Sequence, residues 1–308
     1  MRGGGAALMR ETFEIAEGYE SLLSTHGLGS LAAVWECRLG QRLDKPGLEG
    51  WRQRWRLRLG DNQGQERTLY LKRFEHPPLR RQIARWRGSC WGLSSAGVEW
   101  HNARRLAEAG VAAARPVAYG QQMRGPWEVR SFILLAEVGG ASLERWAAAH
   151  MPPSDREPDA RRPRELCDQL ARFAARFHRA GFVHRDLYLS HVFIEPAGSS
   201  STGGGAGAGE PFCLIDLQRV FRPRWRHRRW VVKDLAQLNY STPASRVGQC
   251  ERLRFLCRYV RECDRFGSAR RLARLIGVKT ARMIRRRPPE DSPAGVGLSV
   301  AHAEAADN

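Results

Sequence analysis

Two short segments that each carry an aspartate beside an apolar strand constrain the fold of this 308-residue chain most strongly. The polar loop His184–His191 carries Asp186, and the run Phe212–Asp216 has four apolar residues followed by Asp216. Between them lies Pro196–Pro211, whose glycine, serine and alanine residues cannot bury side chains. We expect that segment to be a flexible loop that extends a hairpin turn. Each aspartate then stands at the end of a loop or strand.

This pair of carboxylates suits phosphoryl transfer. One aspartate can orient an acceptor hydroxyl while another binds the metal ion that bridges the phosphates. The loop follows a helical pattern whose apolar face runs from Leu166 to Phe177 and ends before Gly181, so Asp186 is presented on a rigid scaffold. The alternatives are a surface carboxylate for Asp186 and an ordinary turn residue for Asp216.

The remainder of the chain divides into a strand-rich part and a helical part. Strand patterns cover residues 31–37, 51–59, 68–74, 112–119 and 131–137. A helix is expected from Val98 to Ala109, ended by Gly110, and residues 231–284 follow a helical pattern. We therefore predict an α+β fold with two lobes, an antiparallel-sheet lobe over 31–138 and a mainly helical lobe over 139–288. Residues 1–30 form an N-terminal extension with a short helix within 13–23, and residues 289–308 form a loose tail.

Net charge narrows the choice of partner. Lysine and arginine number 51 against 32 acidic residues, and the resulting charge of +19 predicts an anionic partner: phosphate, acidic lipid or nucleic acid. The alternative is a general use of arginine on ordinary surfaces. Only four cations are lysines, so Lys72 inside the apolar run Thr68–Phe74 invites a chemical explanation. An ammonium is a compact charge that fits between phosphates, although an exposed strand cation is the alternative.

Several classes of protein are disfavoured. The seven cysteines form no CxxC pair, which predicts reduced thiols in a cytoplasmic protein rather than a disulfide framework or a zinc module. No run approaches the ~18 apolar residues of a membrane-spanning helix, and the N-terminus lacks a secretory pattern.

These residues resemble the protein-kinase signature His-Arg-Asp…Asn followed by Asp-Phe-Gly. Tyr70-Leu-Lys72 resembles the strand lysine that contacts the α- and β-phosphates, and Glu99 resembles its partner on the following helix. For Glu99 the alternative is an acid favoured in a first helical turn by the helix dipole. The order Lys, Glu, Asp, Asp is that of kinases.

The departures from that signature point to one family. His191 stands at the metal-binding Asn position, Asp216-Leu-Gln218 replaces Asp-Phe-Gly, no Ala-Pro-Glu follows, and no compact G-x-G-x-x-G-x-V precedes Lys72. With the motifs at 98–106, 110–120 and 216–236, the chain is similar to the bacterial lipopolysaccharide kinase family of the Kdo/WaaP type, the heptose kinases of the core. The resemblance covers roughly Trp51 to Pro243. It implies a bilobal protein-kinase-like enzyme that uses ATP and Mg²⁺ to phosphorylate a heptose or Kdo hydroxyl of the lipopolysaccharide inner core.

Carried over residue by residue, the resemblance makes Asp186 the catalytic base, Asp216 the metal ligand, and Lys72 the phosphate contact held by Glu99. For His191 the role stays open, because magnesium prefers oxygen ligands. The alternatives are weak metal binding, phosphate binding, or support of the loop alone.

Three further segments receive weaker assignments. Glu137 falls where the linker between lobes would offer backbone groups to adenine. Asp234 resembles the buried helix acid that braces the catalytic loop, with a plain helix N-terminal acid as the alternative. The glycine-bearing segment 40–50 stands where a loop would cover the phosphates, but its spacing is loose and a plain strand connection is equally compatible.

The basic segment Arg222–Trp230 lies just past Asp216, where a kinase receives its acceptor. Arginine forks match phosphate and carboxylate oxygens, and its two tryptophans suit sugar faces or a membrane interface; a solvated charged face is the alternative. A second basic cluster would extend the same field: Arg80, Arg81, Arg85 and Arg87. We expect a lipopolysaccharide core or lipid A-core acceptor at an anionic membrane surface, on the inner face of the inner membrane, and no nucleic acid. A phosphotransferase for a protein or small-molecule hydroxyl stays open, and a catalytically dead binding module is disfavoured because Lys72, Asp186 and Asp216 are all present.

Overall fold

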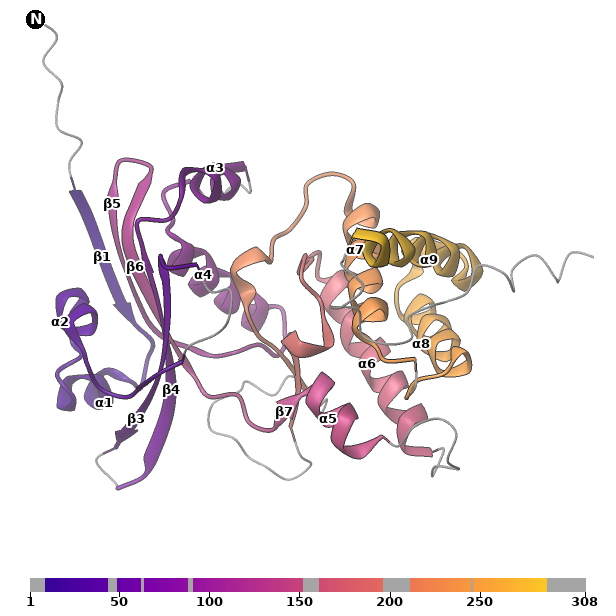
Figure 1. Cartoon of the computed structure of the whole chain (residues 1–308), viewed down its shortest axis with the longest axis horizontal. Helices are drawn as coiled ribbons and strands as arrows, with labels where there is room; N and C mark the ends of the chain where they lie inside the picture. The colour runs from indigo at the N-terminus through magenta and orange to yellow at the C-terminus, as the bar shows by residue number, and fades with distance from the viewer. Residues whose placement is uncertain are drawn as a thin grey trace, which may run out of the picture.

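The computed structural model describes residues 9–43, 49–61, 64–87, 91–151, 161–195, 211–244 and 246–286. Three predicted segments lie wholly or partly outside these ranges. They are residues 196–210 of the expected flexible loop, the expected tail 289–308, and residues 44–48 of the glycine-bearing segment. Figure 1 shows two lobes, a twisted sheet with short helices on the left and a bundle of helices on the right. The predicted α+β, two-lobed architecture is confirmed.

The small lobe is built on a six-stranded antiparallel sheet in the order β1-β5-β6-β4-β3-β2. Its strands are β1 (Met9–Ile15), β2 (Gln41–Arg42), β3 (Arg52–Gly60), β4 (Glu66–Glu75), β5 (Pro116–Arg124) and β6 (Trp127–Ala136). In β3, large apolar residues alternate with arginines as the sequence predicts, and Leu57 pairs with Leu69 of β4 on the buried face. Arg54 pairs with Lys72 on the opposite face, so the sheet turns its cations toward the second lobe.

The structure differs from the sequence prediction over the first forty residues. Residues 31–36, predicted as a strand, form helix α2 (Leu31–Glu36), and the predicted helix within 13–23 is replaced by the end of β1 and by helix α1 (Glu20–Thr25). Ser30 caps α2 by accepting a hydrogen bond from the Ala33 N–H. The buried Arg73 of β4 donates to the carbonyls of Val34 (2.6 Å) and Cys37 (2.8 Å), which fixes the helix on the sheet.

Two helices complete the small lobe: α3 (Leu79–Arg87) and α4 (Ser95–Glu108). The predicted helix is confirmed in α4, which Ser94 caps at its start and Gly110 follows at φ 67°. Asn102 of α4 donates to the carbonyls of Leu217 (2.9 Å) and Val220 (2.7 Å) in the second lobe. Helix α4 is thus a connection between the lobes.

The large lobe carries a three-stranded antiparallel sheet: β7 (Ala141–Ser142), β8 (Val192–Ile194) and β9 (Phe212–Leu214). Its helices are α5 (Leu143–His150), α6 (Arg161–Arg179), α7 (His227–Ser241), α8 (Gln249–Glu262) and α9 (Ala269–Arg286), with short 3-10 turns η1 (Leu189–His191), η2 (Leu217–Arg219) and η3 (Asp264–Phe266). The predicted hairpin is confirmed, because Val192 pairs with Leu214 and Ile194 with Phe212. Within the described ranges no helix has the length and apolarity needed to cross a membrane. We propose residues 137–140 as the boundary between the lobes.

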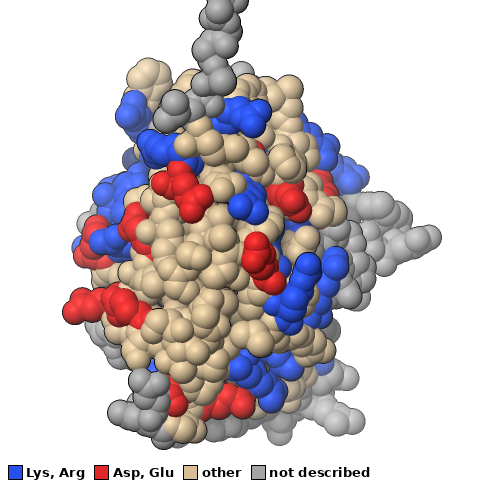
Figure 2. All heavy atoms as spheres, turned by 90° about the vertical axis from the view of Figure 1, so that its left-hand side faces the viewer, with Lys and Arg blue, Asp and Glu red and all other residues tan. Residues whose placement is uncertain are grey.

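The outer face of the small lobe does not account for the net charge. Figure 2 views this face, on the left of Figure 1, and shows cations and carboxylates interspersed around a broad neutral centre. An anionic partner is therefore better matched to other faces.

Gly140, just before β7, offers a test of how closely the lobe boundary packs. Its φ is 76°, and a Cβ there would lie 2.0 Å from the carbonyl oxygen of Ile194, whereas Gly110 has a similar φ of 67° and open space around it. We expect Gly110→Ala to lower the free energy of unfolding by about 1–2 kcal/mol, the cost of a left-handed alanine. Gly140→Ala should cost more, because it also pushes β7 away from β8. Urea unfolding measures both, and equal losses would contradict the close approach.

Candidate active site

Lys72 of β4 lies between two carboxylates. Its ammonium donates to Glu99 Oε1 of α4 at 2.7 Å and to Asp216 Oδ1, after β9, at 3.4 Å. Glu99 is fully buried, and its second oxygen accepts a hydrogen bond from Gln218 Nε2 at 3.1 Å. Buried charges are stable only when paired in this way. The cluster therefore joins both lobes at one point.

Asp216 is held as a carboxylate. Its burial alone would raise the pKa, but the positive charge of Lys72, and after it those of His191 and Arg54, outweigh burial and hold the pKa well below its usual range. The residue has a left-handed backbone, with φ 58° and ψ 60°, at the point where β9 turns into η2. Such backbone strain in a non-glycine residue is often stored at functional sites.

The backbone of the loop around Asp186 is held by Asp234 of α7. The Asp234 side chain is fully buried and accepts the backbone N–H of His184 at 2.6 Å and that of Arg185 at 2.8 Å. The interpretation of Asp234 as a brace for this loop is thereby confirmed. Arg185 has a left-handed φ of 69°, and its guanidinium lies over the rings of Phe221 and Trp230 at 5.6 and 5.3 Å. A carboxylate and two aromatic rings thus hold a backbone that the chain would not adopt alone.

His191 lies between the two aspartates. Its Nδ1 is 2.8 Å from the Asp186 carbonyl oxygen, so Nδ1 is assigned the proton, and Nε2 faces Asp216 Oδ2 at 4.0 Å. The Asp186 carboxylate accepts two hydrogen bonds of 2.7 Å from Nη1 of Arg219, whose side chain is about half exposed. His184 beside them is buried, which lowers its pKa and keeps it neutral, and its Nε2 donates to the Ile215 carbonyl at 3.1 Å.

The donor set around Asp216 fits magnesium that is shared with a phosphate. Magnesium takes one or two carboxylates and completes its octahedron with water and phosphate oxygens. Across the described ranges, no three His, Cys, Asp or Glu side chains form a metal-binding group, so the protein alone offers only a partial shell. In such a shell Asp216 would supply an oxygen, and the Nε2 of His191 would be a less suitable donor.

Glu137 lies apart from this cluster. Its N–H donates to the Thr68 carbonyl at 3.1 Å, and its side chain accepts from the Tyr70 hydroxyl at 3.1 Å. Since Tyr70 precedes Lys72 by two residues on β4, both side chains lie on the same face of the sheet. Of the six predicted site residues, the structure brings Lys72, Glu99, Asp186, His191 and Asp216 together, and it leaves Glu137 at the edge.

Sequence reasoning missed four residues that organise the site: Arg54, Asn102, Gln218 and Arg219. Gln218 and Arg219 directly follow Asp216, and the sequence shows them only as a departure from Asp-Phe-Gly. Arg54 is one of several alternating arginines on β3, so only its pairing with Lys72 distinguishes it.

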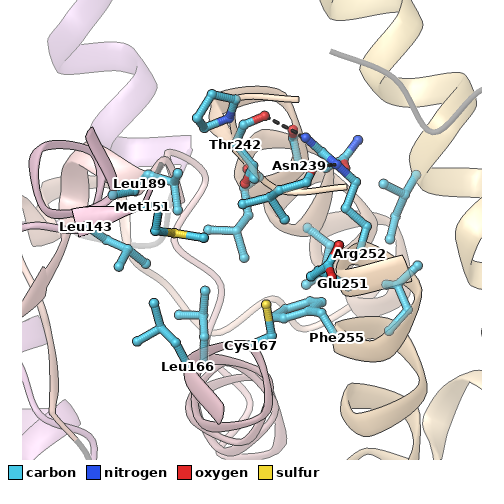
Figure 3. A pocket seen from close by; sticks show the side chains of 18 residues that line it. Leu143, Met151, Leu166, Cys167, Leu189, Asn239, Thr242, Glu251, Arg252 and Phe255 are labelled. Atoms are coloured by element: carbon cyan, nitrogen blue, oxygen red, sulfur yellow. Dashed lines mark hydrogen bonds between the residues drawn. The ribbon is translucent and has the colours of Figure 1, made fainter. Parts of the chain in front are cut away.

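A separate apolar cavity lies in the large lobe, among helices α5 to α8 (Figure 3). Its lining includes Leu143, Ala147, Met151, Leu166, Leu170, Leu238 and Phe255. At one end Arg252 donates to the main-chain carbonyls of Thr242 (2.7 Å) and Asn239 (3.1 Å), so its charge is held by the backbone. Burial raises the pKa of the lining thiol Cys167 to about 12, and Glu251 and Arg252 are the charged residues of the lining. The cavity therefore suits an apolar chain.

Comparison with known proteins gives one consistent result. The family model for the "Lipopolysaccharide kinase (Kdo/WaaP) family" matches residues 25–259. The lipopolysaccharide core heptose(I) kinase WaaP of Pseudomonas aeruginosa is 34% identical over 167 residues, which are 54% of this chain and 59% of that protein. The Escherichia coli protein of the same name is 29% identical over 191 residues, 62% of this chain and 69% of that protein. The match thus spans less than two thirds of the Pseudomonas relative. A solved structure, "WaaP in complex with acyl carrier protein", superimposes with a TM-score of 0.63 at 26% identity and covers 89% of this chain and 97% of that one.

The role of Asp234 can be tested by substitution. In Asp234→Asn the amide group would point its N–H at a backbone donor, and Asp234→Ala would leave both backbone N–H groups unpaired. We expect either variant to lose about 2–4 kcal/mol of unfolding free energy, because the hydrogen bonds go to a buried charge. Urea unfolding followed by circular dichroism measures this loss. Unchanged stability in both variants would show that Asp234 does not hold the loop.

Proposed function

The chain belongs to the lipopolysaccharide kinase (Kdo/WaaP) family, and on that premise we propose that it transfers the γ-phosphoryl group of ATP to a heptose hydroxyl of the lipopolysaccharide inner core. The observation that carries the proposal is the contact of Lys72 with carboxylates from both lobes, beside the loop of Asp186. This is the arrangement that phosphoryl transfer requires, a cation and a metal ligand for the phosphates next to a carboxylate for the acceptor.

In this proposal the nucleotide phosphates enter between Lys72 and Asp216. Glu99 keeps the Lys72 ammonium directed at them, and Asp216 would hold magnesium, which when bound would offset the charge of the phosphates. The proposal is supported by the proximity of the two groups, since the Lys72 ammonium lies 3.4 Å from Asp216 Oδ1. Glu137, just after β6, contributes its backbone carbonyl to the adenine, because its N–H already donates to Thr68.

Asp186 acts on the acceptor. It takes the proton of the sugar hydroxyl while the hydroxyl oxygen bonds to the γ-phosphorus and the bond from that phosphorus to ADP breaks. Arg219 now occupies both oxygens of Asp186, so the arriving hydroxyl displaces at least one of its contacts. The guanidinium is then free to face the transferred phosphoryl group, whose charge it complements.

The segment after η2 supports an anionic acceptor. Five arginines here are exposed: Arg222, Arg224, Arg226, Arg228 and Arg229. Trp225 among them is 84% exposed, whereas Trp230 is packed edge-on against Phe221 at 5.3 Å. Of the two tryptophans expected at a sugar or membrane, Trp225 is the more exposed, and Trp230 is half-buried. We place the acceptor phosphates on these arginines and the enzyme at the inner face of the membrane.

We further propose that an acyl carrier protein binds the large lobe, with its acyl chain in the apolar cavity of Figure 3. The solved relative is a complex with such a protein, and the cavity offers an acyl chain a leucine-rich lining in which Glu251 and Arg252 are the charged residues. Burial of each methylene in such a site contributes about 0.8 kcal/mol.

The cavity proposal is tested by filling the cavity. Ala147 of α5 lines it, and its neighbour Ala148 is exposed on the same helix. We expect Ala147→Phe to weaken binding of acyl-loaded carrier protein by about tenfold or more, the equivalent of two lost methylene contacts. Ala148→Phe, the matched control, should bind acyl-loaded carrier protein as the parent chain does. Both variants should also bind carrier protein that has no acyl chain with the affinity of the parent chain. Equal affinity of Ala147→Phe and the parent chain in calorimetry would contradict the proposal.

The catalytic proposal is tested with labelled ATP and dephosphorylated lipopolysaccharide core, with a protein acceptor in parallel. Asp186→Asn keeps the shape of the side chain but removes the base, so kcat for the core should fall by about 10²-fold or more while ATP affinity changes little. The matched control is Asp168→Asn, which also breaks an arginine–carboxylate pair, with Arg254, but on the surface of the large lobe.

Three results would count against this assignment. Unchanged kcat in Asp186→Asn would remove that residue from the mechanism. An equal loss in Asp168→Asn would show a general effect of breaking an ion pair. Label on the protein acceptor alone would favour a protein kinase.

A further inference from the structure

Helix α3 buries polar side chains and exposes apolar ones, the reverse of the usual arrangement in a surface helix. Its inward side carries Gln82 and Arg85, whose side chains are almost completely buried. Gln82 Oε1 accepts the Glu128 N–H at 2.8 Å, and Arg85 forms an ion pair with the buried Glu128 carboxylate. The outward side carries Leu79, 58% exposed, and Ile83, 39% exposed. Polar contacts thus anchor the helix and hold its apolar stripe toward solvent.

Three tryptophans continue this stripe. Trp86 follows Leu79 and Ile83 at helical spacing, stacks on Trp91 with ring centroids 5.6 Å apart, and meets Trp127 edge-on at 4.5 Å. Trp91 is 69% exposed and Trp127 is 39% exposed. We name these five residues the α3 patch. Large aromatic side chains gathered at a surface mark an interaction site rather than scattered exposure.

The border of the α3 patch is basic. Arg80 and Arg81 of the same helix share one carboxylate, Glu49, at 2.8 and 3.6 Å, which leaves one positive charge in excess. Arg124, at the end of the hairpin beside Trp127, is exposed as well. Tryptophan next to arginine is the combination that membrane interfaces favour, since indole rings settle at the headgroups and guanidinium groups pair with anionic phosphates.

The position of the α3 patch relates it to the active site. Helix α3 leads through residues 88–94 into α4, which carries Glu99, and it lies at the upper edge of the small lobe in Figure 1. The segment between η2 and α7 rises toward the top of the view in Figure 1 as α3 does, and Trp225 of that segment is 84% exposed. Each lobe therefore has one segment with an exposed tryptophan and arginines.

We propose that the α3 patch docks on the surface of an anionic lipid bilayer and so holds the enzyme on the membrane in which a lipid-linked acceptor lies. The inference rests on the proposed function for the nature of the acceptor, and on the structure for the docking surface. Charge complementarity selects a bilayer over an apolar protein groove, because the exposed aromatic side chains are bordered by cations. The docking contact involves no catalytic residue.

The test is co-sedimentation of the full chain with vesicles of phosphatidylcholine and phosphatidylglycerol, without nucleotide or lipopolysaccharide. The double variant Leu79→Gln/Ile83→Gln should lose about tenfold or more in partition coefficient, because two large apolar side chains no longer leave water. The matched control is Leu253→Gln/Leu275→Gln, which removes two equally exposed leucines from α8 and α9 and should bind as the parent chain does. Pure phosphatidylcholine vesicles, or added salt, should weaken binding of the parent chain.

A second measurement does not depend on variants. Lipids with brominated acyl chains should quench the tryptophan emission of the parent chain if Trp91 and Trp127 reach the interface. No vesicle binding by the parent chain, or equal binding by the double variant, would overturn the proposal. Selective capture of a protein through the same five residues, with no binding to vesicles, would overturn it too.

Transfer to a deacylated, soluble core oligosaccharide separates this inference from the proposed function. The double variant should phosphorylate the soluble acceptor as fast as the parent chain and should be slower only on lipopolysaccharide in vesicles. Vesicle binding without any phosphotransfer would refute the proposed function and leave the docking surface standing. Phosphotransfer without vesicle binding would refute the docking surface alone.

Discussion

The site depends on how the charge of Lys72 is compensated. One of its partners, Glu99, belongs to the small lobe, and the other, Asp216, follows a strand of the large lobe. Because Glu99 is fully buried, a displacement of α4 would leave a buried carboxylate without its cation, which is among the most costly events in a protein interior. Asn102 adds two hydrogen bonds from α4 to the large lobe. The position of α4, and with it the relation of the two lobes, is therefore fixed by these polar groups together with the buried Ala103 and Leu106, which pack into the apolar core of the large lobe.

Patterns that are local in sequence could be predicted, and contacts distant in sequence could not. The alternation of apolar residues with arginine predicted β3, and a glycine predicted the end of α4. Apolar runs on either side of a Gly/Ser segment predicted the β8–β9 hairpin. The run Leu31–Glu36 has no clear period, and it becomes a helix because Arg73, nearly forty residues later, reaches its carbonyls. Strand β1 was missed for the same reason, since its partner β5 lies about a hundred residues away. In both cases tertiary contacts decided between helix and strand.

The same distinction holds within the site. The motifs around Lys72, Glu99, Asp186 and Asp216 carried enough chemistry to predict that these residues meet. Gln218 and Arg219 occupy positions where the kinase signature has other residues, so their side chains had no expected partner. Their contacts with Glu99 and Asp186 follow only from the left-handed turn at Asp216, which redirects the chain into η2. A backbone conformation of this kind leaves no trace in hydrophobic periodicity.

The excess of arginine has two different uses in this fold. Arg73, Arg85 and Arg185 are embedded, and their planar forks bind carbonyls, a carboxylate or aromatic faces, which a lysine ammonium would match less well. The arginines between η2 and α7 and those bordering α3 are instead exposed. The outer face of the small lobe has mixed charge, so the field of the protein is uneven. An anionic surface would consequently be attracted to these exposed arginines, and electrostatic attraction would orient the enzyme before any apolar side chain touched it.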